Sequence, residues 1–192
     1  MLSMIKKRGP ELLLEAFFIV FAVLVALAVE EWNDGRELRA QADMARAAVL
    51  SELEGNRAEL MVGKDSTLAM LDRATDVVRR LRQGEDVVEV NISGVLPDFS
   101  DAAWETARVT GTVARMDYVW VLETARVYQT QALTLDLQRE LLSMIGSLAV
   151  RAADLERFTE FRGQLVILTI LHDELDRKYD SLMAHSEDWG PD

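Results

Sequence analysis

The sequence predicts an all-α protein with one N-terminal transmembrane helix followed by an extramembrane antiparallel helical bundle. Residues 12–29 are apolar except for Glu15. The rest of the chain is rich in Ala, Leu, Glu and Arg and poor in Gly and Pro, which favours helix. Apolar residues also recur at steps of three and four over long stretches, as they do on the buried faces of helices. We therefore expect a short tail at 1–11, a membrane helix at 12–32, a bundle at 33–185 and an acidic tail at 186–192.

The apolar run is the first predicted element. Its 18 residues would span roughly 27 Å as a helix, close to the hydrocarbon thickness of a bilayer. The alternative is a cleaved secretory signal, for which Ala26-Leu27-Ala28 offers a cleavage site. The run is longer than the usual apolar core of a signal peptide. A retained anchor is therefore the prediction.

Basic residues near the run bear on its orientation. Three lie on each side: Lys6, Lys7 and Arg8 before it, and Arg36, Arg39 and Arg46 after it. The first cluster is compact and adjoins the run, and long domains are translocated largely regardless of charge. The expected N-terminus is therefore cytoplasmic, with the helical domain on the other side of the membrane.

Four residues of the anchor are candidates for specific contacts. Glu15 is the only ionisable residue within the run, and it either lies near the headgroups or meets a polar group of a partner helix. Ala22 and Ala26 form a small-xxx-small spacing that permits close helix approach. Trp32, just beyond the run, suits an interfacial anchor. We predict partner binding in the membrane through Glu15, Ala22 and Ala26.

The end of the run resembles a group of uncharacterised bacterial single-pass membrane proteins, whose anchor opens with Glu-Ile-Leu and ends in an Ala-Leu-x4-Trp-Asn exit motif. The identical positions are Glu11, Leu24, Ala26, Leu27, Trp32 and Asn33, with Val23, Val25 and Val29 as conservative replacements. Ala28, Glu30 and Glu31 depart from the commoner polar amides of that group. The resemblance implies a short N-terminal tail, one membrane helix and an extramembrane helical domain. Together with the orientation expected from charge, it predicts a protein of the bacterial inner membrane with its domain in the periplasm. It supplies no catalytic residue and no ligand.

The bundle begins with one long helix, continuous with the anchor through Asn33-Asp34-Gly35 and ending at Gly84. Its predicted apolar face is Leu53, Leu60, Leu71, Ala74, Val78 and Leu81, interrupted by Arg57, Lys64 and Thr67. Residues 85–99 contain several Val residues before Gly94 and Pro97, which predicts a loop or a short edge strand.

Three further helices are expected. Ser100 caps a short helix that carries Trp104 and ends near Gly111. The next helix has a predicted seam of Ala114, Tyr118, Val121, Ala125, Tyr128, Ala132, Leu135 and Leu142, with Gly146 as a weak point. The last has a seam of Phe158, Phe161, Leu165, Leu168, His172, Leu175, Tyr179 and Leu182. Such amphipathic helices can share one core.

Chemistry-bearing residues are sparse. His172 on the last seam is expected in the core, with metal binding together with Asp176 as the alternative, while His185 lies near the chain end. The Glu-x-x-His pattern of di-iron bundles is absent from the sequence. Four aromatic residues on neighbouring helices either pack in the core or line a small-molecule pocket: Trp104, Tyr118, Trp120 and Tyr128.

Charge and composition narrow the function. Three of the 21 basic residues and none of the 33 acidic residues lie in the first ten positions, so the rest of the chain is strongly acidic and unsuited to nucleic acid. The chain has no Cys for a disulfide, thiolate site or nucleophile. We predict a non-enzymatic, cofactor-free interaction module whose partners are the bilayer and other membrane subunits or a second copy. The alternative is an extracytoplasmic ligand-sensing bundle acting through a partner.

Overall fold

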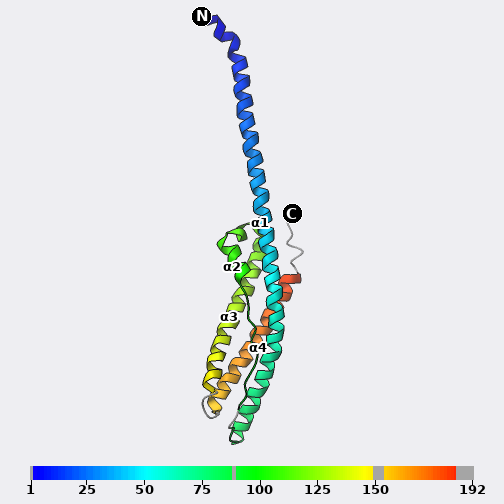
Figure 1. Cartoon of the computed structure of the whole chain (residues 1–192), viewed down its shortest axis with the longest axis vertical. Coiled ribbons are helices and arrows are strands. Elements are labelled where there is room, and N and C mark those ends of the chain that lie inside the picture. The colour runs from blue at the N-terminus through cyan, green and yellow to red at the C-terminus, as the bar shows by residue number, and fades with distance from the viewer. Residues whose placement is uncertain (1, 88–89, 149–153, 185–192) are drawn as a thin grey trace.

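The computed structural model describes residues 2–87, 90–148 and 154–184, with side chains described at 14–87, 90–146 and 154–184. Within these ranges the chain is helical and contains no strand, which confirms the all-α class. The elements, in chain order, are α1 (Leu2–Arg82), α2 (Ala102–Val109), the 3-10 helix η1 (Thr112–Arg115), α3 (Tyr118–Leu148) and α4 (Leu155–Ala184). The lower part of α1 forms a bundle with α3 and α4, and its N-terminal part projects from one end of that bundle (Figure 1).

Helix α1 is continuous through Asn33-Asp34-Gly35, as predicted, and ends where Gly84 turns the chain. Gly84 has φ +76°, and the backbone N–H of Glu85 donates to the carbonyl of Arg80. A residue with a side chain would be strained at this φ, so glycine suits the end of the helix.

A strap of extended chain, residues 90–101, then returns along α1 toward the end of the bundle where α1 enters. As the chain advances along the strap, its partners step backward along α1: Ser93 accepts from Arg73, Val95 N–H donates to Ser66 Oγ at 2.7 Å, and Ser100 N–H donates to Asn56 Oδ1 at 2.9 Å. The strap is a loop, so the alternative of an edge strand is wrong for its described residues.

The strap sets the direction of every later helix. Because it carries the chain back along the bundle, α3 starts at the end where α1 enters and runs parallel to it (Figure 1). Helix α4 runs antiparallel to both and packs against both. The predicted antiparallel arrangement therefore holds for α4 and is wrong for the pair α1 and α3, because the strap, residues 90–101, runs back along the bundle and is not a tight turn.

The seam of α4 is confirmed in full. All eight predicted residues, from Phe158 to Leu182, are buried. On α1 the buried positions also alternate by steps of three and four: Val49, Leu53, Asn56, Leu60, Gly63, Thr67, Met70, Ala74 and Val77. This repeat of seven residues is that of left-handed coiled-coil packing. Thr67, predicted to interrupt the apolar face of α1, is fully buried within it.

The seam of α3 differs from the prediction. Its buried residues are Trp120, Thr124, Val127, Gln131, Thr134, Gln138 and Leu141, together with Tyr128 and Thr130. Of the predicted residues, Ala114, Tyr118, Ala132 and Leu142 are exposed. Apolar spacing gave the wrong face because the true seam carries several Thr and Gln side chains, which the spacing rule assigns to solvent.

Capping corrects two predicted helix starts. Ser100 was expected to cap α2, but its Oγ lies 3.4 Å from Ala102 N, and the first turn is capped mainly by Glu52 of α1. Helix α3 begins one turn later than predicted, because the Asp117 carboxylate accepts the N–H of Trp120 at 2.8 Å. An Asp at this position is a strong start signal.

Among the described residues, no helix is both long enough and apolar enough to cross a membrane. The predicted segment 12–32 lies on α1, and the side chains of its first two residues are outside the described ranges.

Candidate functional site

Glu52 organises the end of the bundle where α2 packs on α1. Its carboxylate accepts hydrogen bonds from the backbone N–H of Ala103 at 2.9 Å, from Ser100 Oγ at 2.7 Å and from the hydroxyl of Tyr128 at 2.6 Å. Burial works to raise the pKa of Glu52, but these bonds together with that from Trp104 N–H outweigh it, and the pKa lies below its ordinary value. An ionised Glu52 thus joins α1, α2, α3 and the strap.

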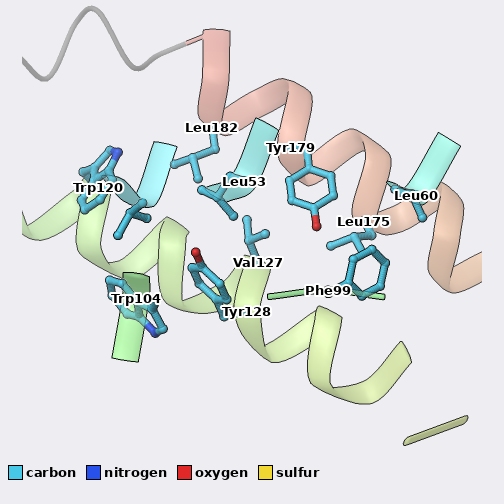
Figure 2. Packing of buried hydrophobic residues seen from close by; sticks show 11 residues of the cluster. Leu53, Leu60, Phe99, Trp104, Trp120, Val127, Tyr128, Leu175, Tyr179 and Leu182 are labelled. Carbon is cyan, nitrogen blue, oxygen red and sulfur yellow. The ribbon is translucent and has the colours of Figure 1, made fainter. Parts of the chain in front are cut away.

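The four predicted pocket aromatics have different positions. Trp104 and Tyr128 stack in parallel, with ring centroids 5.5 Å apart, and both are buried (Figure 2). Trp120 is fully buried in the same cluster, with the Arg46 guanidinium 5.5 Å from the ring centroid. Tyr118 is 75% exposed. Trp104, Trp120 and Tyr128 therefore contribute to the core, and Tyr128 also lines a cavity.

That cavity, of about 570 Å³, lies between the strap and α3. Its strap side includes Pro97, Asp98 and Phe99, and its α3 side includes Gln131 and Gln138. The volume falls in the range of small-molecule sites, which combine apolar walls with a few polar groups. The strap is hydrogen-bonded to α1 on one side, and on the other side the cavity separates it from part of α3.

Two buried amides line the cavity. Gln131 donates through Nε2 to the Tyr179 hydroxyl at 2.5 Å, while its Oε1 has no hydrogen-bond partner. Gln138 is 4% exposed, and its Nε2 also has no partner. A buried amide atom without a partner costs on the order of 1–3 kcal/mol. Both unpartnered atoms are buried, so the folded chain itself carries this cost.

His172 lies seven residues before Tyr179 on α4, and Gln138 lies seven residues after Gln131 on α3. Because Gln131 contacts Tyr179 and the two helices are antiparallel, His172 and Gln138 lie at the same level of the bundle. It is fully buried, and both ring nitrogens lack a hydrogen-bond partner. Burial, with a smaller effect of the positive Lys64, lowers the pKa of His172 to about 4, so the ring is neutral at neutral pH.

The other candidate metal residue, Asp176, instead faces the cations of α1. Its carboxylate lies 3.3 Å from Lys64 Nζ and 3.8 Å from Arg57 Nε. Within the described parts of the chain, no group of three or more His, Cys, Asp or Glu side chains could hold a metal ion. His185 and the acidic tail fall outside the described residues.

The anchor candidates all lie on the projecting part of α1. Glu15, Ala22 and Ala26 are exposed. Trp32 is 65% exposed, and the Arg36 guanidinium lies over its ring at 5.2 Å from the centroid. The structure thus places these residues on the free helix and shows no contact that would assign a partner to them.

Comparison of the chain with protein-family models, with curated proteins and with solved structures finds no match.

Glu52, Gln131 and Gln138 were not among the site residues predicted from the sequence. Glu52 caps α2 through Ala103, which lies 51 positions further along the chain, and no local sequence pattern indicates a contact over that distance. The burial of Gln131 and Gln138 could have been predicted, because both follow the seven-residue repeat of the other seams. The same repeat contains Trp120, Thr124 and Val127. The repeat was obscured by its polar residues.

Proposed function

We propose that the chain is a membrane-anchored, non-enzymatic interaction module, which holds a helical bundle at the bilayer surface as a self-associating scaffold or as an accessory subunit of a membrane complex. One observation carries the proposal: every side chain from Leu14 to Val29 is exposed, and all but Glu15 are apolar. An apolar surface that surrounds a free helix is unstable in water and stable in lipid.

Charge and resemblance support the rest of the proposed topology. The basic tail before residue 12 and the resemblance of the 23–33 segment to bacterial single-pass anchors favour the bacterial inner membrane, with the bundle in the periplasm. Residues 12–32 are then the membrane helix, and Trp32 with Arg36 lies at the interface where it ends.

A second apolar surface supports protein contacts by the bundle. Val166, Ile167 and Ile170 of α4 are 41%, 50% and 57% exposed. They lie on the face of α4 that points away from its buried seam, so packing within the bundle does not explain them. In a membrane complex both this face and the anchor could contact a partner subunit or a second copy.

Crosslinking of the full chain in native membranes tests the proposal. The chain has no Cys, so single-cysteine variants at exposed positions report contacts without background. We expect crosslinks to another subunit or to a second copy, and we expect Ile167→Asp to reduce them more than Leu133→Asp, a matched exposed position on α3. A chain that runs as a lone monomer in mild detergent, with no crosslinked partner in membranes, would contradict the proposal.

A further inference from the structure

The second half of α3, residues 131–146, begins with a polar stretch of seam. From position 131 to position 138 the buried side chains of α3 are Gln131, Thr134 and Gln138, and none of them is apolar. The seam of α4 that α3 packs against is apolar except for His172 and the hydroxyl of Tyr179. Closure of α3 on α4 over this stretch therefore removes little apolar surface of α3 from water.

Hydrogen bonds between the two helices compensate for this only in part. Gln131 donates to the Tyr179 hydroxyl, but Thr134 Oγ1 donates to the carbonyl of Thr130 within α3 itself, at 2.9 Å. Oε1 of Gln131 and Nε2 of Gln138 are buried without a partner among the described residues. Both atoms would be hydrated if this part of α3 moved away from α4, so their burial favours separation.

The other flank of the same half-helix is loosely packed. The cavity of about 570 Å³ beside the strap is lined on α3 by residues from Tyr128 to Leu142. Within the described parts of the chain, α4 is the only helix that packs along this half of α3. The contact with α4 therefore carries most of what holds the half-helix in place.

The first half of α3 is held much more firmly. Trp120 and Val127 are buried, and Tyr128 stacks on Trp104 and donates to Glu52. In the second half, by contrast, Leu141 is the only buried apolar side chain of residues 131–146. The change from firm to weak packing falls just after Tyr128.

We propose that the second half of α3 opens away from α4 as a unit, while the first half of α3 and the packing of α1 on α4 are retained. The bundle then has a closed and an open state, with the hinge next to Tyr128. Opening uncovers the part of the α4 seam that packs with Leu141, which comprises Phe161, Leu165 and Leu168. Segments with few buried apolar contacts are those that open locally in folded proteins. The inference does not depend on the membrane anchor.

Hydrogen exchange of the full chain in mild detergent, followed by mass spectrometry of its peptides, tests this opening. We expect the backbone amides of residues 131–146 to exchange at least about tenfold faster than the most protected amides of α1 and α4, after correction for intrinsic rates.

A pair of matched variants tests whether the polar seam is the cause. Gln138→Leu replaces the unpartnered amide by an apolar side chain of similar size, so exchange of residues 131–146 should slow by about five- to thirtyfold. Gln129→Leu makes the same change at an exposed position of α3 and should leave that rate as it is in the parent.

Val78→Ala separates local opening from global unfolding. Val78 is buried in a cluster with Val77, Val87 and Phe158, to which the described residues of α3 do not belong. These contacts are intact in the open state, so the variant should speed exchange of the most protected amides of α4 and leave that of residues 131–146 unchanged.

Three results would overturn the inference. The first is equal protection of residues 131–146 and of the most protected amides of α4 in the parent. The second is equal acceleration of both in Val78→Ala, which would show that α3 exchanges only through global unfolding. The third is an effect of Gln138→Leu that is no larger than that of Gln129→Leu.

Discussion

Replacement of Gly63 by Ala should destabilise the bundle, although the same change at Gly55 should stabilise it. Both glycines lie within α1, where Ala is the better helix former by about 0.5–1 kcal/mol. They differ in their surroundings. An added Cβ at Gly55 would meet nothing within 4 Å, whereas at Gly63 it would lie 2.2 Å from Cδ of Pro97.

The loss of stability expected in Gly63→Ala depends on which part of the chain must move to accommodate the added Cβ. The Cβ added at Gly63 would also lie 2.8 Å from the backbone nitrogen of Pro97, so no rotation of a side chain relieves the contact. The strap itself must shift, although it is held on both sides by hydrogen bonds to Ser66 and Asn56. Overpacking of this kind costs about 1–3 kcal/mol, so the two variants should differ by roughly 2 kcal/mol in free energy of unfolding.

Urea unfolding of the full chain in mild detergent, followed by tryptophan fluorescence, measures this difference. Gly55→Ala should unfold at a higher urea concentration than the parent, and Gly63→Ala at a lower one. Adding Pro97→Gly to Gly63→Ala should recover part of the loss, because the double variant removes the clashing ring. Equal stabilisation by both single variants would refute the reasoning that the strap lies tightly against α1.

Three other substitutions test the buried polar groups. His172→Leu should remove a pH dependence of the free energy of unfolding, because the pKa of the ring is the ordinary 6.5 in the unfolded chain and about 4 in the folded chain. The stability that the neutral ring contributes is complete above pH 6.5 and falls as the pH drops, by about 1.4 kcal/mol at pH 5.5. Urea midpoints measured across that pH range would show the difference between the parent and the variant. Glu52→Ala should lower the free energy of unfolding by about 2–4 kcal/mol in the same assay, because it leaves the first turn of α2 and the hydroxyl of Tyr128 without a partner. The control Glu54→Ala, at an exposed position, should change it by less than about 0.5 kcal/mol. Tyr179→Phe should cost about 1–2 kcal/mol by removing the acceptor of Gln131, and an unchanged midpoint would contradict the hydrogen bond.

Much of the fold followed from helical periodicity, because apolar spacing reports burial directly where the seam is apolar. The α4 seam was predicted residue by residue, and Gly84 and Gly111 were placed correctly near helix ends. On α3 the same reasoning chose the wrong face, since Gln131 and Gln138 follow the repeat without being apolar.

The parallel course of α1 and α3 and the site beside the strap could not be predicted from the sequence. A stretch such as 85–99 contains loop signals, but its path depends on contacts with distant residues of α1, such as Ser66 with Val95 and Asn56 with Ser100. The cavity exists because of that path. The sequence offered the four aromatic residues either as core or as a pocket, whereas the cavity in the structure is lined by residues of the strap and of α3, and Tyr128 is the one predicted aromatic in that lining.

The most direct test of the proposed function is the membrane depth of α1. Fluorophores attached to Leu24→Cys and Met44→Cys in the otherwise Cys-free chain can be compared after reconstitution into lipid vesicles. We predict that the label at position 24 is quenched by lipids carrying a spin label deep in the acyl chains and is shielded from aqueous iodide. The label at position 44 should show the reverse. Equal access of iodide to both labels would contradict the membrane anchor.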